Sequence, residues 1–534
     1  MANKKGKDKF SPKLSFPLMG MLYEKMREYA TWYAGEIDLL HEYYNLTSTY
    51  NTFNTQYQLK RNTFWAKQRE SGMTSPIHVP IASSIAELNA DLLFGEAPAV
   101  RINKAHEEDT KEEYKASQDE LDNLLKECDF NQTCLSGSET CSPLGGVYLK
   151  ISVDEELVKR PILQIEQPDY AIPTFRFGIL TEVTFFNTVC VERAKTSDMK
   201  INKIHRLAET YTSNGEILYD LYLGSTDKLG ERVSITSLPQ TKMLKDLKYN
   251  YNGILCVYVP NMLPNRLDRN SSMGRSDLQG LEPLMSALDE TYSSWLRDIE
   301  LSKAKILAPS TYLEESTDID GDLTTRASLE YDKDRAIYGL LNIDPLNADK
   351  NTIMMIQFAI RADEFEKSCL NFIERIVSGA GYSPQSFGLN IQGRVESGNA
   401  LQQRESRSNK KKVKKEAFWM KPLTQLVEAM IGINNEKFGG TIKDDSDITI
   451  EFSDGITSSV KEISEAVAKI RTASAASTET LVKMIHRDWT EEQVKAEVER
   501  IQKEKEAENL TLEDPDMEEQ IDRMNQEKNK NSEE

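Results

Sequence analysis

Two long stretches of helical apolar periodicity, separated by a short acidic segment, constrain the fold more than any other feature. Apolar side chains recur at steps of three, four or seven in residues 275–305 and again in residues 351–377. The first stretch alone would form a rod of about 46 Å. Pro283 stands near its start and either kinks the helix or marks its first turn. We expect a helical hairpin whose insert, residues 306–350, is strand- or loop-like, and whose apolar outer faces pack against neighbours.

The chain before the hairpin changes character at Gly145-Gly146. Helical patterns precede this point, over residues 17–45, 80–94 and 106–127. Strand-like alternation follows to about residue 260, and Asn214-Gly215 between two alternating runs is a strong hairpin signal. The pattern predicts an antiparallel meander and disfavours a doubly wound nucleotide-binding sheet. The fold class is α+β.

The chain after the hairpin begins with a glycine-rich segment. Residues 378–396 hold four glycines and one proline, which predicts a mobile loop; the bland alternative is a plain connector. A third long helix is expected over about 397–435, with a possible bend at Pro422, followed by a strand near Ile448. Further helices are expected over 457–505, and an acidic, disordered tail after them.

Charge and motif content exclude several functions. The chain carries 66 Lys and Arg against 86 Asp and Glu, a net charge of −20, which argues against clamping nucleic acid over the whole surface. The sequence lacks a phosphate-binding P-loop, a nucleophile elbow and a zinc-protease motif. Its five histidines are scattered and its six cysteines form no CxxC pair, which predicts free thiols. We therefore expect no catalytic, cofactor or metal site, and no membrane span.

The predicted helix over 397–435 carries a basic stripe within this acidic chain. Its cationic members include Arg404, Arg407, Lys411 and Lys415. Such a stripe is typical of a surface that faces phosphates or acidic groups. A solvated helix face that balances neighbouring acids remains the alternative.

The order of several short motifs resembles the portal proteins of tailed phages, of the type found in siphophages of Gram-positive hosts. The resemblance spans roughly residues 20–505. Its most telling stretch is Gly274-Arg-Ser-Asp-Leu-Gln-Gly-Leu-Glu-Pro-Leu-Met-Ser-Ala-Leu-Asp-Glu290, and Pro168-Asp-Tyr-Ala-Ile-Pro173, Ser397-Gly-Asn-Ala-Leu401 and Phe452-Ser-Asp454 accompany it.

The resemblance implies a ring of about twelve subunits at one capsid vertex, which conducts double-stranded DNA without sequence specificity. Its implied partners are the terminase large subunit, the head–tail adaptor, and the major capsid and scaffold proteins. The protein would be made in the host cytoplasm and belong to the virion. The implied parts are a flexible basic arm (1–16), wing (17–273), stem helices (274–305 and 351–377), clip (306–350), tunnel loop (378–396), a long basic channel and wing helix (397–438), a wing strand (439–456), crown helices (457–505) and an acidic disordered tail (506–534).

The resemblance also implies roles for individual residues. The cations that face the DNA would be Arg404, Arg407, Lys411 and Lys415. The tunnel loop would include Ser378, Gly379, Gly381, Tyr382, Phe387, Gly388, Gly393 and Arg394. The stem interface between subunits would use Leu288, Tyr292, Trp295, Ile299, Phe365 and Phe372. The clip surface would present Glu314, Glu315, Asp318 and Asp320 to its partners.

Two other functions stay open at this point. A minor head or capsid protein would use the same helices for structural contacts and would pass no DNA. A DNA-processing enzyme is disfavoured, because no metal-ligand cluster or paired nucleophile and base is found. Asp318-Ile-Asp320-Gly-Asp322 resembles the start of a calcium loop, but its glycine is misplaced and Leu329 stands where the loop needs glutamate.

Overall fold

The structure is a computed structural model, in which residues 1–453 and 454–534 form separate units. The residues that it describes are 9–11, 13–16, 18, 20–50, 63–66, 75–103, 111–193, 202–251, 253–302, 305–309, 337–341, 354–356, 359–389, 398–443, 447–452, 467–473, 476–485 and 491–512.

The first unit begins with helices. They are α1 (Met21–Ala34), α2 (Ile37–Tyr50), the short η3 (Phe64–Ala66), α3 (Ile81–Phe94), α4 (Lys111–Glu127) and α5 (Phe130–Leu144). The single helix expected over 17–45 is wrong, because Gly35 adopts a left-handed φ of 68° and ends α1. The helix expected over 80–94 is confirmed. Helix α5 was missed by the sequence analysis.

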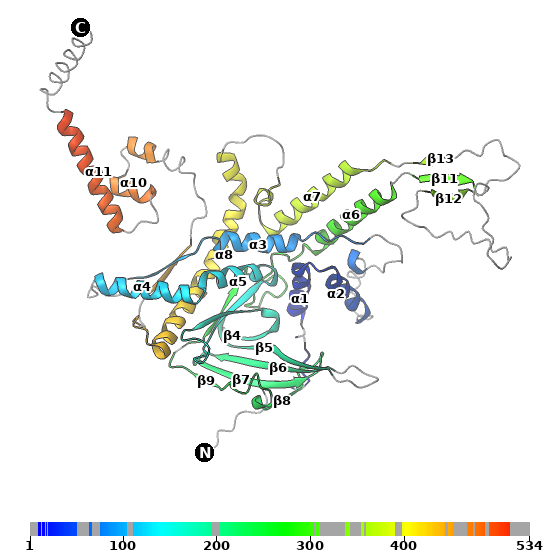
Figure 1. The fold of residues 1–534 in the computed structure, drawn as a ribbon, viewed down its shortest axis with the longest axis horizontal. Coiled ribbons are helices and arrows are strands. Elements are labelled where there is room, and N and C mark those ends of the chain that lie inside the picture. The colour runs from blue at the N-terminus through cyan, green and yellow to red at the C-terminus, as the bar shows by residue number, and fades with distance from the viewer. Residues whose placement is uncertain are drawn as a thin grey trace, which may run out of the picture. The chain divides into compact units, whose positions relative to one another are not determined.

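The strands of the expected meander pair with one another in antiparallel fashion. The largest sheet has the order β4-β5-β6-β7-β8, with β9 paired to β7 (Figure 1). The expected hairpin is confirmed, since β6 and β7 pair across Gly215, whose φ is 70°. The bounds are β4 (Ala171–Arg176), β5 (Ile179–Arg193), β6 (Asn202–Thr212), β7 (Glu216–Gly224), β8 (Glu231–Val233) and β9 (Leu247–Lys248), with turns η4 (Pro168–Tyr170) and η5 (Ile235–Ser237) beside them.

Two smaller sheets complete the region before and after the helical hairpin. Strand β2 (Gly146–Ser152) lies between β10 (Cys256–Pro260) and β3 (Ile162–Glu166). Strand β1 (Ala99–Ile102) pairs with β14 (Ile448–Glu451), far along the chain, which confirms the strand expected near Ile448. This pairing ties the end of the first unit to its N-terminal helices.

The helical hairpin is shorter than expected. Helix α6 spans Glu282–Leu301 and α7 spans Ala362–Ala380, and they lie side by side (Figure 1). Pro283 marks the first turn of α6 and does not kink it. Part of the second predicted helix is wrong, because β13 (Met354–Ile356) pairs with β11 (Lys305–Pro309). Strand β11 also pairs with β12 (Ile337–Leu341), which confirms strands in the insert.

Helix α8 (Gly398–Ile433) runs through Pro422 without interruption and passes into a π-helical turn, η9 (Asn434–Phe438). Its second half contributes Trp419, Leu423, Leu426 and Met430 to the main core, together with β2, β10 and α5. A second core joins α1, α2 and α3 to α6 and α7. Helices α1 and α3 contribute residues to both cores, so the hairpin is anchored to the sheet region at its base.

Both ends of the chain differ from the predicted parts. Phe16 is buried and Phe10 packs on Phe186, so the loose arm expected over residues 1–16 is wrong for these two residues. In the second unit, α10 (Thr478–Ile485) begins after Ser477, whose hydroxyl accepts from the Thr480 amide, as the sequence predicts for a helix cap. Helix α11 (Glu491–Leu512) extends into the segment that we expected to be disordered; residues 513–534 lie outside the described residues.

Candidate functional site

A buried polar cluster lies where the base of the helical hairpin meets α5 and α8. At its centre is Asp277, in the loop that connects β10 to α6. This loop passes so close to the end of α5 that a Cβ on Gly145 would lie 2.9 Å from the Gly274 carbonyl oxygen. Gly145 also has a φ of 83°, so only glycine satisfies both demands. Gly145 thus allows the close packing that positions Asp277.

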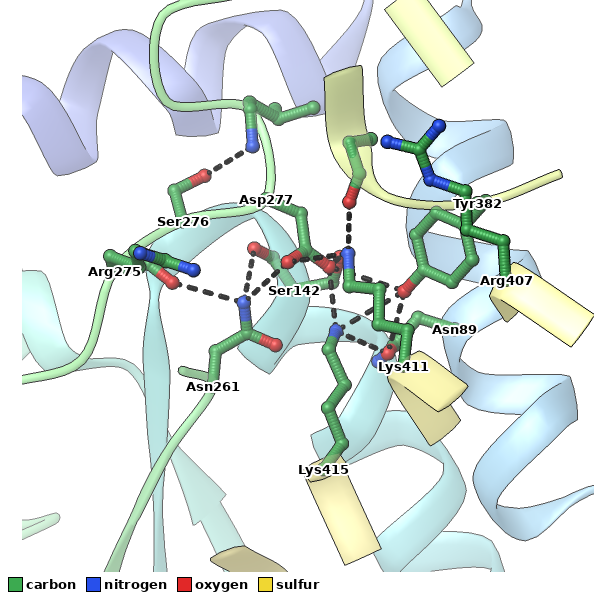
Figure 2. Close-up of polar contacts among 12 residues, drawn as sticks. Asn89, Ser142, Asn261, Arg275, Ser276, Asp277, Tyr382, Arg407, Lys411 and Lys415 are labelled. Atoms are coloured by element: carbon green, nitrogen blue, oxygen red, sulfur yellow. Dashed lines mark hydrogen bonds and ion pairs between the residues drawn. The ribbon is translucent and has the colours of Figure 1, made fainter. Parts of the chain in front are cut away.

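Neutral groups hold the Asp277 carboxylate from one side. The Ser142 hydroxyl donates to Oδ2 at 2.8 Å, and the Asn261 amide donates to Oδ1 at 2.9 Å. The backbone amide of Asp277 in turn donates to the Ser142 carbonyl at 3.0 Å. These bonds fix the carboxylate between α5 and the start of the hairpin (Figure 2).

Two lysines one helical turn apart on α8 reach the same carboxylate. Lys411 Nζ lies 2.8 Å from Oδ1 and Lys415 Nζ lies 2.6 Å from Oδ2. Both side chains are buried, with 8% of Lys411 and 1% of Lys415 exposed. Lys415 also donates to the Tyr382 hydroxyl at 3.2 Å and to Asn89, and the Tyr382 hydroxyl donates to Asn89 at 3.0 Å (Figure 2).

The cluster holds more positive than negative charge. Burial would raise the pKa of Asp277, but Lys411 and Lys415 outweigh it and hold the pKa well below its usual range. Burial lowers the pKa of Lys411 to about 7, against the opposing effect of Asp277. One carboxylate therefore faces two buried ammonium groups. Burial of the second positive charge, which has no carboxylate of its own, costs free energy.

The predicted DNA-facing lysines need correction. Lys411 and Lys415 do not face solvent, because their partner Asp277 draws them into the subunit interior. Arg407 is exposed, and its guanidinium donates to the Ser378 carbonyl at 2.7 Å at the end of α7. Arg404 lies in the first turns of α8. The exposed cations of this helix include Lys410, Lys414 and Lys421.

The predicted tunnel loop is largely packed structure over the residues described. Ser378 and Gly379 belong to α7, Gly381 ends that helix with a φ of 96°, and Gly388 ends the short η8 (Pro384–Phe387). Tyr382 is fully buried, and Phe387 packs against the second core. The expectation of mobility is therefore wrong for residues 378–389. Gly393 and Arg394 lie outside the described residues.

The predicted stem residues mostly pack within the subunit itself. Leu288 is fully buried, and Trp295 stacks on Phe365 with ring centroids 6.1 Å apart. Tyr292 and Phe372 also pack against the second core. Leu288 is thus unavailable to a neighbour, which corrects that part of the prediction. Ile299, 41% exposed, remains on the outer surface of α6.

The remaining predicted site cannot be placed. Glu314, Glu315, Asp318 and Asp320 lie outside the described residues. Within the part of the chain that the structure describes, no cluster of His, Cys, Asp and Glu could hold a metal, and no helix is long and apolar enough to cross a membrane.

The residues at the centre of the cluster are far apart in the sequence and were not predicted from it. Asp277 and Asn89 lie 138 and 326 positions from Lys415, so no local pattern joins them. One available signal was the Gly274-Arg-Ser-Asp277 stretch, which carried the resemblance without a physical role. In the structure, Asp277 of this stretch is the counter-charge for Lys411 and Lys415 of α8.

Known proteins resemble the chain to different degrees. No curated protein matches the chain. A solved structure described as the neck of a native GTA particle computed with C12 symmetry has a similar chain, with 12% identity, 78% of this chain and 96% of that one covered, and a TM-score of 0.34. A similarity that weak carries no argument. The model of the family described as "Phage portal protein, SPP1 Gp6-like" matches residues 22–510, and the chain belongs to that family.

Proposed function

We propose that the chain assembles into a ring of about twelve subunits at one capsid vertex, through which double-stranded DNA passes during packaging and ejection. The observation that carries the proposal is the family match, which covers both structural cores, the helical hairpin and most of the second unit. The family consists of structural, non-enzymatic components of the phage particle. The chain is therefore a virion protein of the head–tail connector region.

Ring formation is supported by apolar side chains that the subunit leaves exposed on its long helices. Ile299 on α6 and Leu370 on α7 are 41% and 45% exposed, and Val413 and Met420 lie one heptad apart on α8 at 62% and 45%. A cyclic assembly buries such side chains at a repeated heterologous interface. We place subunit contacts along α6, α7 and α8.

DNA passage is supported by the charge distribution. The net charge of −20 keeps duplex DNA from adhering, whereas the exposed cations Arg407, Lys410 and Lys414 lie on the first half of α8. We retain residues 390–396, with Gly393 and Arg394, as the proposed tunnel loop. Contacts there would be to phosphates and independent of base sequence.

Docking is proposed for the insert between the stem helices. Strands β11, β12 and β13 form its described part, and Glu314, Glu315, Asp318 and Asp320 remain the proposed partner surface. This clip would contact the terminase large subunit first and the head–tail adaptor afterwards. Major capsid and scaffold proteins would contact the outside of the ring.

Imaging and mass measurement of the purified full chain test the proposal. We expect rings of about a dozen subunits with a central hole in negative-stain electron microscopy. A chain that stays monomeric or dimeric, even when its scaffold protein is present during assembly, would favour the alternative of a minor head protein without a channel.

A loop variant tests DNA passage separately from assembly. Shortening residues 390–396 should leave the rings intact and impair DNA retention in particles. The matched control removes a similar length from the 154–159 turn in the wing, which lies outside the hairpin. Equal DNA retention in the two variants would contradict the proposed tunnel loop.

A further inference from the structure

A basic cleft opens beside the buried Asp277 cluster. Its volume is about 340 Å³, within the range of roughly 300–1,000 Å³ for ligand pockets. The walls come from the loop before α6, the end of α7 and the exposed side of α8. Six of its lining side chains are cationic, and Asp277 is the sole acid among the described lining residues; the cations are Arg266, Arg275, Arg407, Lys410, Lys411 and Lys414.

Two of these cations are already engaged by the protein. Lys411 pairs with Asp277 and donates to the Ala380 carbonyl, and Arg407 donates to the Ser378 carbonyl. These carbonyls lie at the C-terminal end of α7, which is the negative end of the helix dipole. Asp277 also pairs with Lys415, which does not line the cleft. The Asp277 carboxylate and these two carbonyls are thus already engaged by Lys411, Lys415 and Arg407.

The other four cations have no such partner. Among the described residues, the side chains of Arg266, Arg275, Lys410 and Lys414 make no ion pair with a carboxylate. Arg275 is half-buried, and burial together with repulsion from Arg266 lowers the pKa of its guanidinium. Four positive charges therefore converge on one concave surface of a chain that is strongly acidic overall. An anion in the cleft would relieve their mutual repulsion.

The lining selects the class of anion. Guanidinium groups match the oxygens of phosphate with two parallel hydrogen bonds, and lysine ammonium groups add point charges. The described lining has no aromatic ring on which a base could stack, and Gly379, Ala380 and Gly381 give one wall little side-chain bulk. The cleft thus has groups that can bind a phosphate, and its described lining has no group on which the base of a nucleoside could stack.

We propose that this basic cleft binds a phosphate group through Arg266, Arg275, Lys410 and Lys414. The group is either a backbone phosphate of DNA or free inorganic phosphate, since both present the same oxygens. The inference does not rest on ring formation or DNA passage, because phosphate binding is measurable on the purified chain in any oligomeric state.

Isothermal titration of the full chain with inorganic phosphate, against sodium chloride of equal ionic strength, tests the site. We expect saturable phosphate binding that Lys410→Gln weakens about tenfold, the effect of one charge-assisted hydrogen bond. Arg275→Gln should weaken it at least as much. Lys421→Gln is the matched control, because Lys421 is exposed on the same helix and does not line the cleft. Lys410 is exposed, so its variant remains informative if Arg275→Gln fails to fold.

Binding of a short DNA duplex to the same proteins distinguishes the two sources. If phosphate competes with the duplex, and Lys410→Gln weakens both, the ligand is a DNA phosphate. If Lys410→Gln weakens phosphate binding alone, the ligand is free phosphate. The proposal is overturned if phosphate acts no differently from chloride, or if Lys421→Gln and Lys410→Gln weaken phosphate binding equally.

Discussion

Replacing Asp277 with asparagine tests whether the buried cluster holds the hairpin to α8. The change keeps the shape of the side chain and removes its charge. Lys415 and Lys411, 1% and 8% exposed, would then lose their shared carboxylate. Removing one partner of a buried ion pair typically costs about 3–5 kcal/mol. We expect a loss of that size in the free energy of unfolding, a large part of the roughly 5–15 kcal/mol of a folded domain.

The pH dependence follows from the direction of the pKa shift. The pKa of Asp277 is depressed in the folded state, so its contribution is present above the unfolded pKa, roughly 3.9, and disappears as the pH falls toward the folded value. The difference between the wild type and Asp277→Asn should therefore be full at pH 7 and shrink below about pH 4.

Urea denaturation at pH 7, followed by circular dichroism, measures the difference. Glu451→Gln is the control, because Glu451 makes a longer contact of 3.9 Å with Arg101 and both side chains are more than half exposed. Such a surface pair contributes about 0–1 kcal/mol. If Asp277→Asn costs no more than Glu451→Gln, the cluster does not hold the hairpin and the reasoning fails.

Three further changes test other contacts. Trp295→Ala removes the stack on Phe365 and should cost about 2 kcal/mol in thermal denaturation of the subunit, whereas Ile299→Ala should weaken ring assembly in mass measurements and leave that stability nearly unchanged. Tyr382→Phe removes a buried hydroxyl bonded to Asn89 and should cost about 1–2 kcal/mol in urea denaturation; no change would contradict the bond. Gly215→Ala strains a φ of 70° and brings Cβ to 2.6 Å from the Tyr251 carbonyl, so the melting temperature should fall.

Elements that rest on local periodicity could be predicted from the sequence. The helix expected over 80–94 is observed as Ile81–Phe94, because its apolar face repeats within the helix itself. The turn at Asn214-Gly215 needs only the residues beside it. Both features are set by short-range chemistry, so one sequence suffices to find them.

Elements that depend on distant partners were missed. Residues 354–356 satisfy a helical repeat, yet they form β13, because β11 offers a strand partner about fifty positions earlier. Helix α5 contains Gly137 and Pro143, which disfavour helix. It forms because Cys134, Cys141 and Leu144 are buried in the main core, and tertiary packing outweighs propensity.

The two buried lysines show why the site could not be predicted from the sequence. They also lead to a last prediction. Two lysines at i and i+4 are the pattern of a solvated face, and it is the distant Asp277 that pairs with both of them in the interior. Because the folded pKa of Lys411 is about 7 and its unfolded value is 10.5, the unfolded chain binds more protons between these pH values. Wild-type stability should therefore rise from pH 7 to pH 10 relative to Lys411→Met.

Lys415→Met is the matched comparison for this change, since it removes the lysine that also contacts Asn89 and Tyr382. Lys411→Met leaves Asp277 with one ammonium partner, whereas Lys415→Met also leaves the Asn89 oxygen and the Tyr382 hydroxyl without their cation. Urea denaturation at pH 7 should show the larger loss for Lys415→Met. Equal losses in the two variants, with parallel pH profiles, would mean that the two ammonium groups are equivalent and that the cluster carries no surplus charge.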